Sequence, residues 1–284
     1  MIGLDIAPIA LRVLTYAGSI AAAGGVLFAV GFPRPADAIR SDIERQIFAG
    51  CCLLLLVEPV RYAVFQLSIS GGDWSIAFAS ELRWMGMQTP IGQAAVTRLI
   101  AAVTLMTLGL RSSAIGLAAG LIMIASFALE GHTASSEART ALSIGALLMH
   151  VTAVHWWLGA LYPLIILTRR AEPATLSAVV ETFGRRATWI VAGLFGAGAF
   201  LFVVLTGGRL NVESPYQQRF CLKFLLVVSL LSIAAWNKLR LTPLLIRDHE
   251  TGRARLRFSM KLEMLLALSI LVTTAWAISS SPDG

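Results

Sequence analysis

Long uncharged apolar stretches constrain this sequence more than any other feature. A bilayer core of roughly 30 Å is crossed by about 20 apolar residues in a helix. A backbone in lipid must satisfy its own polar groups, and these stretches do so as helices because they lack the alternation of a membrane barrel. Eight such stretches occur, at Ile9–Val30, Gln46–Ile69, Gln93–Leu110, Ala114–Glu130, Leu142–Thr168, Ala187–Gly207, Arg219–Asn237 and Leu262–Ser279.

The composition favours the same fold class. Only 14% of the 284 residues are charged and 57% are hydrophobic, whereas soluble domains carry about 25% charged residues. This composition excludes a soluble globule and a disordered chain. We predict an all-α polytopic membrane protein with eight transmembrane helices, forming a single membrane domain over residues 1–284. The lipid bilayer is its first expected partner.

The positive charge predicts an orientation in the membrane. The net charge is +7, and most Lys and Arg residues lie in alternate gaps between the apolar stretches. Because basic residues are retained on the cytoplasmic side, these gaps face the cytoplasm and both termini face the periplasm. We therefore predict a bacterial inner-membrane location and expect no nucleic-acid partner. The most basic gaps are residues 34–45, 169–186 and 238–261.

A repeated entry pattern predicts two parallel halves, residues 1–135 and 136–284. Thr89-Pro90-Ile91-Gly92 precedes the third stretch, and Arg98 follows its proline by eight residues. Ser214-Pro215-Tyr216-Gln217 precedes the seventh stretch, with Lys223 at the same spacing. An internal repeat that preserves direction is common in membrane transporters. The alternative is that proline and a snorkelling cation begin two unrelated helices.

Three of the four histidines lie in the fourth and fifth stretches or in the outer gap between them, and the fourth, His249, lies in a basic cytoplasmic gap. At about 1.5 Å per residue, His132 lies at the outer mouth, His150 about 12 Å into its helix and His155 about 20 Å. Imidazole suits copper in either oxidation state, so the three are candidate metal ligands. His150 and His155 are five positions apart, about 140° on a helix, and do not share a face. The alternative is an interhelical hydrogen bond for each ring.

Four methionines are candidate thioether ligands, since thioether sulfur suits Cu(I). Met123 lies at a depth close to that of His150, and Met149 is adjacent to this histidine. Met85 and Met87 follow Trp84 in an outward gap that we expect to be a flexible loop. The alternative for each methionine is simple packing.

Glu58 lies about a dozen residues into the second stretch, where a carboxylate is costly unless it is paired or protonated. We predict that it pairs with Arg61, Arg98 or Lys223. The alternative is a proton or cation relay. Glu130, at the outer end of the fourth stretch, is a further polar candidate beside His132.

Several motifs carry a resemblance to a known family. The stretch His150-Val-Thr-Ala-Val-His155-Trp156-Trp157-Leu158-Gly159-Ala160-Leu161 resembles the CopD copper-resistance signature of a histidine, six residues and Trp-x-Gly-Gly-Leu, with Ala160 in place of its second glycine. Gly131-His132 resembles the outer Gly-His of that family. Further matches to its third-helix entry, its Tyr-x6-Lys segment and its Asn-Arg-x-Arg-Leu-Thr-Pro exit are Thr89, Gly92, Arg98, Tyr216, Lys223 and Asn237–Pro243.

The resemblance implies an inner-membrane protein that handles periplasmic copper and passes copper ions into the cytoplasm. By position, it implies that His132 and His150 are copper ligands, whereas His155 is a candidate from spacing alone. We expect no enzyme activity, and transport without an ATPase in particular, since the phosphate-binding Gly-x4-Gly-Lys-Ser/Thr motif is missing. A separate periplasmic copper-binding protein is an expected partner, and an oligomer stays open.

Two other functions fit the same residues. A haem-bearing electron-transfer or metal-reductase bundle would use axial histidines on facing helices, for which His132 with His150 is the conceivable pair. A copper-sensing module would signal through the basic segment 247–257. A visible spectrum distinguishes the first alternative, and transport in liposomes argues against the second.

Overall fold

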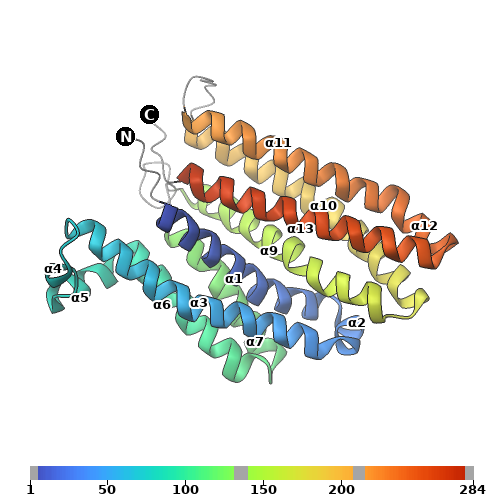
Figure 1. Cartoon of the computed structure of the whole chain (residues 1–284), viewed down its shortest axis with the longest axis horizontal. Coiled ribbons are helices and arrows are strands. Elements are labelled where there is room, and N and C mark those ends of the chain that lie inside the picture. The colour runs from blue at the N-terminus through green and yellow to red at the C-terminus, as the bar shows by residue number, and fades with distance from the viewer. Residues whose placement is uncertain (1–5, 131–139, 207–214, 279–284) are drawn as a thin grey trace.

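A computed structural model of the chain describes residues 6–130, 140–206 and 215–278. The long helices run side by side in one bundle, and two short helices project from it as an arm (Figure 1). Every regular element in these ranges is helical, which confirms the predicted all-α class.

The N-terminal part of the bundle is built from three long helices and their connections. Its elements are α1 (Ile6–Gly31), α2 (Pro33–Ala38), α3 (Arg40–Ile69), α4 (Trp74–Ala77), α5 (Ser80–Gln88), α6 (Pro90–Thr104), the π-helical turn η1 (Leu105–Gly109), α7 (Ser113–Ala125) and the 3-10 turn η2 (Ser126–Leu129).

The C-terminal part contains α10, the longest of the described helices. Its elements are α9 (Ala141–Arg170), α10 (Pro173–Thr206), α11 (Pro215–Trp236), the π-helical turn η3 (Asn237–Leu241), α12 (Thr242–Arg247) and α13 (His249–Ile278).

Six helical segments of the described chain are long and apolar enough to cross a membrane. They are Ile6–Gly31, Arg40–Ile69, Pro90–Gly109, Ala141–Arg170, Cys221–Arg247 and His249–Ala277. The fourth predicted stretch forms a shorter apolar segment, Ser113–Leu129. The described part of the sixth, residues 187–206, lies within α10, which is not among the six. The protein is therefore a helical membrane protein, and the count of eight spans and the repeat remain predictions.

Helix α1 lies at the centre of the bundle and packs against α3, α7, α9 and α13. Its approach to α9 is closest at two glycines, since a Cβ added to Gly159 would lie 2.7 Å from the backbone carbon of Gly24. A similar contact joins Gly18 of α1 to Gly50 of α3, where an added Cβ on Gly50 would lie 2.6 Å from the Gly18 oxygen. Small residues at these crossings let helix backbones come together in lipid, where apolar side chains gain nothing by leaving the solvent.

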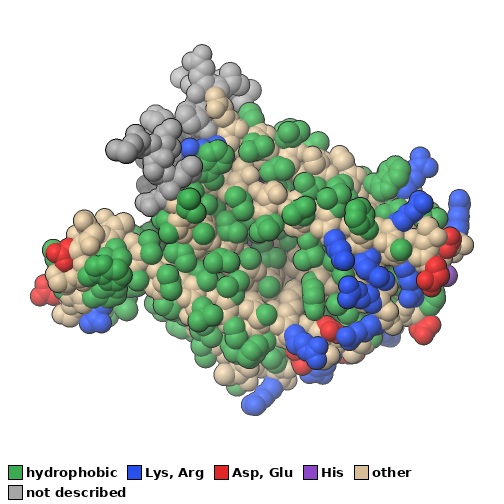
Figure 2. Space-filling view, in the orientation of Figure 1, with side chains coloured by type: hydrophobic (Ala, Val, Ile, Leu, Met, Phe, Trp, Pro, Cys, Tyr) green, Lys and Arg blue, Asp and Glu red, His purple; other side chains and the backbone are tan. Residues whose placement is uncertain are grey.

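The two ends of the bundle differ in charge. Lys and Arg side chains gather at the end that carries α2 and α12, on the face shown in Figure 2. Helix α1 begins and α13 ends at the opposite end (Figure 1). This separation of charge along the helix axes is the pattern from which the positive-inside rule predicts a cytoplasmic side.

The outward gap that contains Met85 and Met87 forms an arm of two short helices, α4 and α5, so the expectation of a flexible loop was wrong. Asp73 caps α4 by accepting hydrogen bonds from the N–H groups of Ser75 (2.8 Å) and Ile76 (3.3 Å). A hydrogen bond from the Ser75 hydroxyl, together with these backbone groups, lowers the pKa of the Asp73 carboxyl. Met85 and Met87 lie on the next helix, α5, which begins without a side-chain cap, and their exposed fractions are 64% and 43%. Two positions on a helix are about 200° apart, so the two sulfurs do not face one ion.

Candidate functional site

A buried ion pair joins α3 to α6 at membrane depth. The Glu58 and Arg98 side chains are both fully buried. Arg98 donates from Nε to Glu58 Oε1 (2.8 Å) and from Nη2 to Oε2 (3.1 Å). These contacts confirm the predicted pairing of Glu58. The forked guanidinium matches the geometry of the carboxylate and neutralises its charge in the bundle interior.

Two further charges extend this pair into a cluster. Arg98 Nη2 also donates to Glu130 Oε1 (2.5 Å), and Arg61 donates to both oxygens of Glu130, at 3.1 and 2.5 Å. Arg61 also lies 3.5 Å from Glu58 Oε2. We call Glu58, Arg61, Arg98 and Glu130 the charged cluster. Two carboxylates balance two guanidinium groups, so the cluster adds no net charge to the membrane interior.

Neutral groups surround the charged cluster and connect it to α9. Thr15 of α1 donates to Glu58 Oε1 (2.9 Å), and Arg98 donates to the Ser126 hydroxyl (3.2 Å). The guanidinium carbon of Arg98 lies 5.2 Å from the centre of the Phe127 ring. That ring lies 5.8 Å from the His155 ring.

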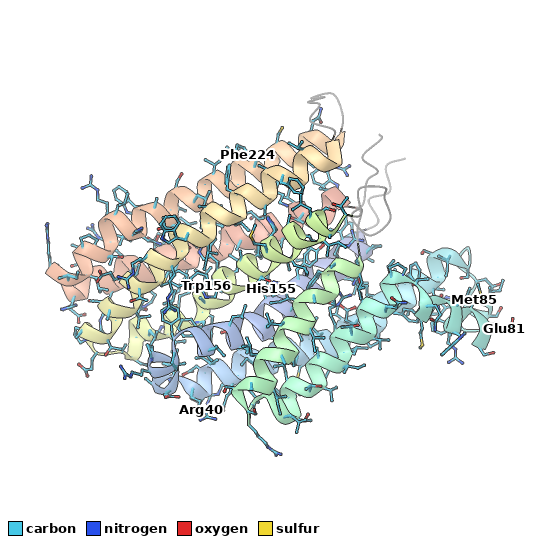
Figure 3. All side chains as sticks on the ribbon, turned by 180° about the vertical axis from the view of Figure 1, so that it is seen from behind. Arg40, Glu81, Met85, His155, Trp156 and Phe224 are labelled. Atoms are coloured by element: carbon cyan, nitrogen blue, oxygen red, sulfur yellow. The ribbon has the colours of Figure 1, made fainter. Side chains whose placement is uncertain are left out.

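His155 uses both ring nitrogens within the protein. Its Nδ1 lies 2.8 Å from the Val151 carbonyl oxygen, and its Nε2 lies 2.7 Å from the Ser19 hydroxyl of α1. A carbonyl oxygen only accepts, so Nδ1 donates and Nε2 accepts from Ser19. The ring is 3% exposed and lies in the middle of the bundle (Figure 3). His155 thus makes the interhelical hydrogen bond that the sequence analysis gave as the alternative to a metal-ligand role. A metal bound at Nε2 would have to displace the Ser19 hydroxyl.

His150 faces different helices. A backbone hydrogen bond joins its ring to Leu194 of α10, and its Nδ1 is buried without a partner. That nitrogen faces Gly198 of α10, where an added Cβ would lie 3.7 Å away. Lys223 of α11 is close enough to act electrostatically on the ring. The different neighbours of His150 and His155 confirm that the two rings do not share a face.

Comparisons with known proteins identify the family. The profile described as "Copper resistance protein D-like, N-terminal domain" matches residues 3–141, and the profile "Copper resistance protein D" matches residues 177–277. Copper resistance protein D of Pseudomonas syringae pv. tomato is 25% identical over 97% of this chain and 96% of its own length. The chain belongs to the copper resistance protein D family. No solved structure matches it significantly.

The family motifs of helices five and seven meet at an acidic residue that sequence reasoning missed. In this copper resistance protein D family member, Trp157 of α9 and Asn237 of η3 both hydrogen-bond to Glu263 of α13. No role was predicted for Glu263 from the sequence. The available signal was a carboxylate at the second position of the eighth apolar stretch.

The remaining candidate ligands of this family member are dispersed. Met123 is fully buried in the apolar core, and Met149 lies on the exposed side of α9 near Gly193. Met85 lies on the arm, far from His155 (Figure 3). His132 lies outside the described residues. Within the described ranges, no three His, Cys, Asp or Glu side chains group as a metal site.

Proposed function

We propose that this chain carries copper ions across a bacterial inner membrane, from the periplasm to the cytoplasm, and has no enzyme activity. Membership of the copper resistance protein D family supports a role in copper handling. The apolar helices support a membrane location, and the proposed topology has eight spans with both termini in the periplasm. Copper is the cargo in this proposal.

The unpartnered nitrogen of His150 carries the proposal. Buried polar atoms are normally hydrogen-bonded, so a buried imidazole nitrogen without a partner needs an explanation. A polar side chain within an apolar membrane helix is energetically costly, and this cost makes His150 a functional candidate. Gly198 leaves space beside it, and the backbone bond to Leu194 holds the ring. A neutral Nδ1 lone pair binds Cu(I) or Cu(II). We propose His132 as a second ligand on the periplasmic side.

Replacing His150 by alanine is expected to abolish copper accumulation. Cells expressing the wild-type chain should accumulate more copper than cells with an empty vector, measured by elemental analysis at equal amounts of membrane protein. His249→Ala is the matched control, because it removes a histidine at the basic end of the bundle. Equal accumulation by His150→Ala and wild type would refute the assignment of this ligand.

Lys223 is expected to oppose copper at the same place. An ammonium group near the imidazole repels a cation, and no ion pair neutralises it among the residues that the structure describes. Lys223→Met should therefore tighten copper binding to purified protein by roughly tenfold, which corresponds to about 1.4 kcal/mol. Titration calorimetry with a competing chelator measures this. Weaker binding by the variant would mean that the amine helps to hold the ion.

The driving force proposed for uptake is the membrane itself. An interior-negative potential contributes about 2.3 kcal/mol per unit charge for each 100 mV. A separate periplasmic copper-binding protein is the proposed donor.

The haem alternative has less support from the histidines. An axial ligand needs a free ring nitrogen, and both nitrogens of His155 are engaged by Ser19 and Val151. A bis-histidine site would thus depend on His132 and His150. A Soret band with sharp reduced α-bands in purified protein would favour haem over copper transport.

A further inference from the structure

The carboxyl group of Glu263 lies at the junction of three helices. Its side chain belongs to α13 and is 3% exposed. Asn237, the first residue of η3, donates a short hydrogen bond from Nδ2 to Glu263 Oε1. Trp157 of α9 supplies a second hydrogen bond. Because the indole N–H only donates, both partners act as donors toward the carboxyl oxygens.

The partners of Glu263 are neutral, in contrast to those of Glu58. Both acids are buried in long apolar helices, but Glu58 is bonded to Arg98 and approached by Arg61. None of the ion pairs in the described part of the chain involves Glu263. An ionised carboxylate buried without a cation is costly, and such a group takes up a proton instead.

The charged and titratable side chains on the helices around Glu263 have other partners or positions. Lys261, two residues earlier on α13, is exposed and on another face. On the neighbouring elements, Arg257 donates to Thr168, Lys238 donates to Thr188, Arg240 lies over the Trp236 ring and His155 binds Ser19. Arg12 of α1 and Arg247 of α12 also make no ion pair with Glu263.

We propose that Glu263 is a proton-exchange site of this protein, which holds a proton at one stage of the transport cycle and is a carboxylate at another. The O–H bond breaks when water reaches the carboxyl from the basic end of the bundle, and the proton passes to that water. The resulting carboxylate is held by the two N–H donors of Asn237 and Trp157. This inference rests on the proposed copper transport: when one Cu(I) binds to the protein as one proton leaves it, the net charge of the protein itself stays constant.

The Asn237 amide can form a hydrogen bond with Glu263 in both of its protonation states. Its Oδ1 is buried without a partner, although its Nδ2 binds Glu263. Turning the amide presents Oδ1 to a protonated carboxyl, which can donate to it, and turning it back presents Nδ2 to a carboxylate. Asn237 also begins the π-helical turn that precedes Pro243, and its carbonyl accepts from the Thr242 hydroxyl (3.0 Å). π-Helical turns are frequent at functional sites, so protonation acts on an irregular joint between α11 and α12.

Infrared difference spectroscopy of the full-length protein in lipid tests the proton site without copper. Wild-type protein shifted from acidic to alkaline pH is expected to lose a C=O stretching band of a protonated carboxylic acid. Glu263→Gln should lack that band, and Trp157→Phe, which removes one hydrogen-bond donor, should shift its frequency. Glu81→Gln is the matched control, because Glu81 lies on the exposed arm and its removal should leave the band unchanged.

The outcomes separate this inference from the proposed function. A band that persists unchanged in folded Glu263→Gln protein, or a wild-type spectrum without such a band, would overturn the proton site. Copper uptake by proteoliposomes then tests the coupling: a pH gradient should change the wild-type rate, and Glu263→Gln should lose that dependence. A band that depends on Glu263 in a protein that moves no copper would retain the proton site and reject the transport proposal. Equal sensitivity of both proteins to the gradient would reject the coupling.

Discussion

Arg98→Met is expected to destabilise the folded protein by about 3–5 kcal/mol, because it leaves buried charge without its partner. Glu58 would keep the Thr15 hydroxyl and a more distant Arg61, but would lose both bonds from Arg98. Glu130 would also lose one of its two cations. Thermal unfolding of purified protein in a mild detergent, followed by circular dichroism, should show a large decrease in Tm.

A double variant distinguishes lost pairing from lost packing. Glu58→Gln combined with Arg98→Met removes both charges and should recover much of the stability, since neutral groups avoid the cost of an unpaired ion. Arg111→Met is the control, because Arg111 is exposed beyond η1. A Tm for Arg98→Met within the error of the Arg111→Met value would show that the cluster contributes little to the fold.

Gly159→Ala is expected to have the second-largest effect. The new methyl group would lie 2.4 Å from the Gly24 Cα and 2.9 Å from the Ile20 oxygen, which are backbone atoms of α1. Helices α1 and α9 would have to separate, and overpacking of this kind costs typically about 1–3 kcal/mol. The same unfolding measurement should show a lower Tm and a decreased yield of monodisperse protein.

Gly145→Ala is the matched substitution on the same helix. Among the described residues, apart from the adjoining turns of α9 itself, no atom lies within 4 Å of a Cβ added there. Alanine should therefore be neutral or stabilise α9 by up to about 1 kcal/mol through its helix propensity. If the two alanine variants unfolded at the same temperature, the close approach of α1 and α9 would not matter for stability.

The helical class and much of the helix placement could be predicted, because apolar length alone decides them in a bilayer. The pairing of Glu58 with Arg98 could also be predicted, because an unpaired carboxylate is energetically costly inside a membrane and needs a cation at a similar depth. The prediction also named Lys223 as a candidate partner of Glu58, because a single sequence does not show which helices are neighbours. In the structure Lys223 approaches His150 instead.

Other features could not be predicted, because they depend on contacts that the spacing of apolar residues does not reveal. In the arm, Asp73 caps α4 through local hydrogen bonds that the polar outward gap did not reveal, whereas α5 begins without a side-chain cap. The different faces of His150 and His155 followed from helix geometry, but the occupation of both His155 nitrogens depended on Ser19 of α1. Glu263 was missed for the same reason, since Asn237 and Trp157 come to it from distant segments.

The electrical balance of the charged cluster has a consequence for an energised cell. Voltage across the membrane pulls on Glu58 and Glu130 in one direction and on Arg61 and Arg98 in the other, so it does almost no net work on a rigid displacement of the four together. Membrane voltage is therefore not expected to displace the contact between α3 and α6 that these four side chains form. Any steep dependence of this protein on membrane voltage must arise elsewhere, from charges that move without a counter-ion.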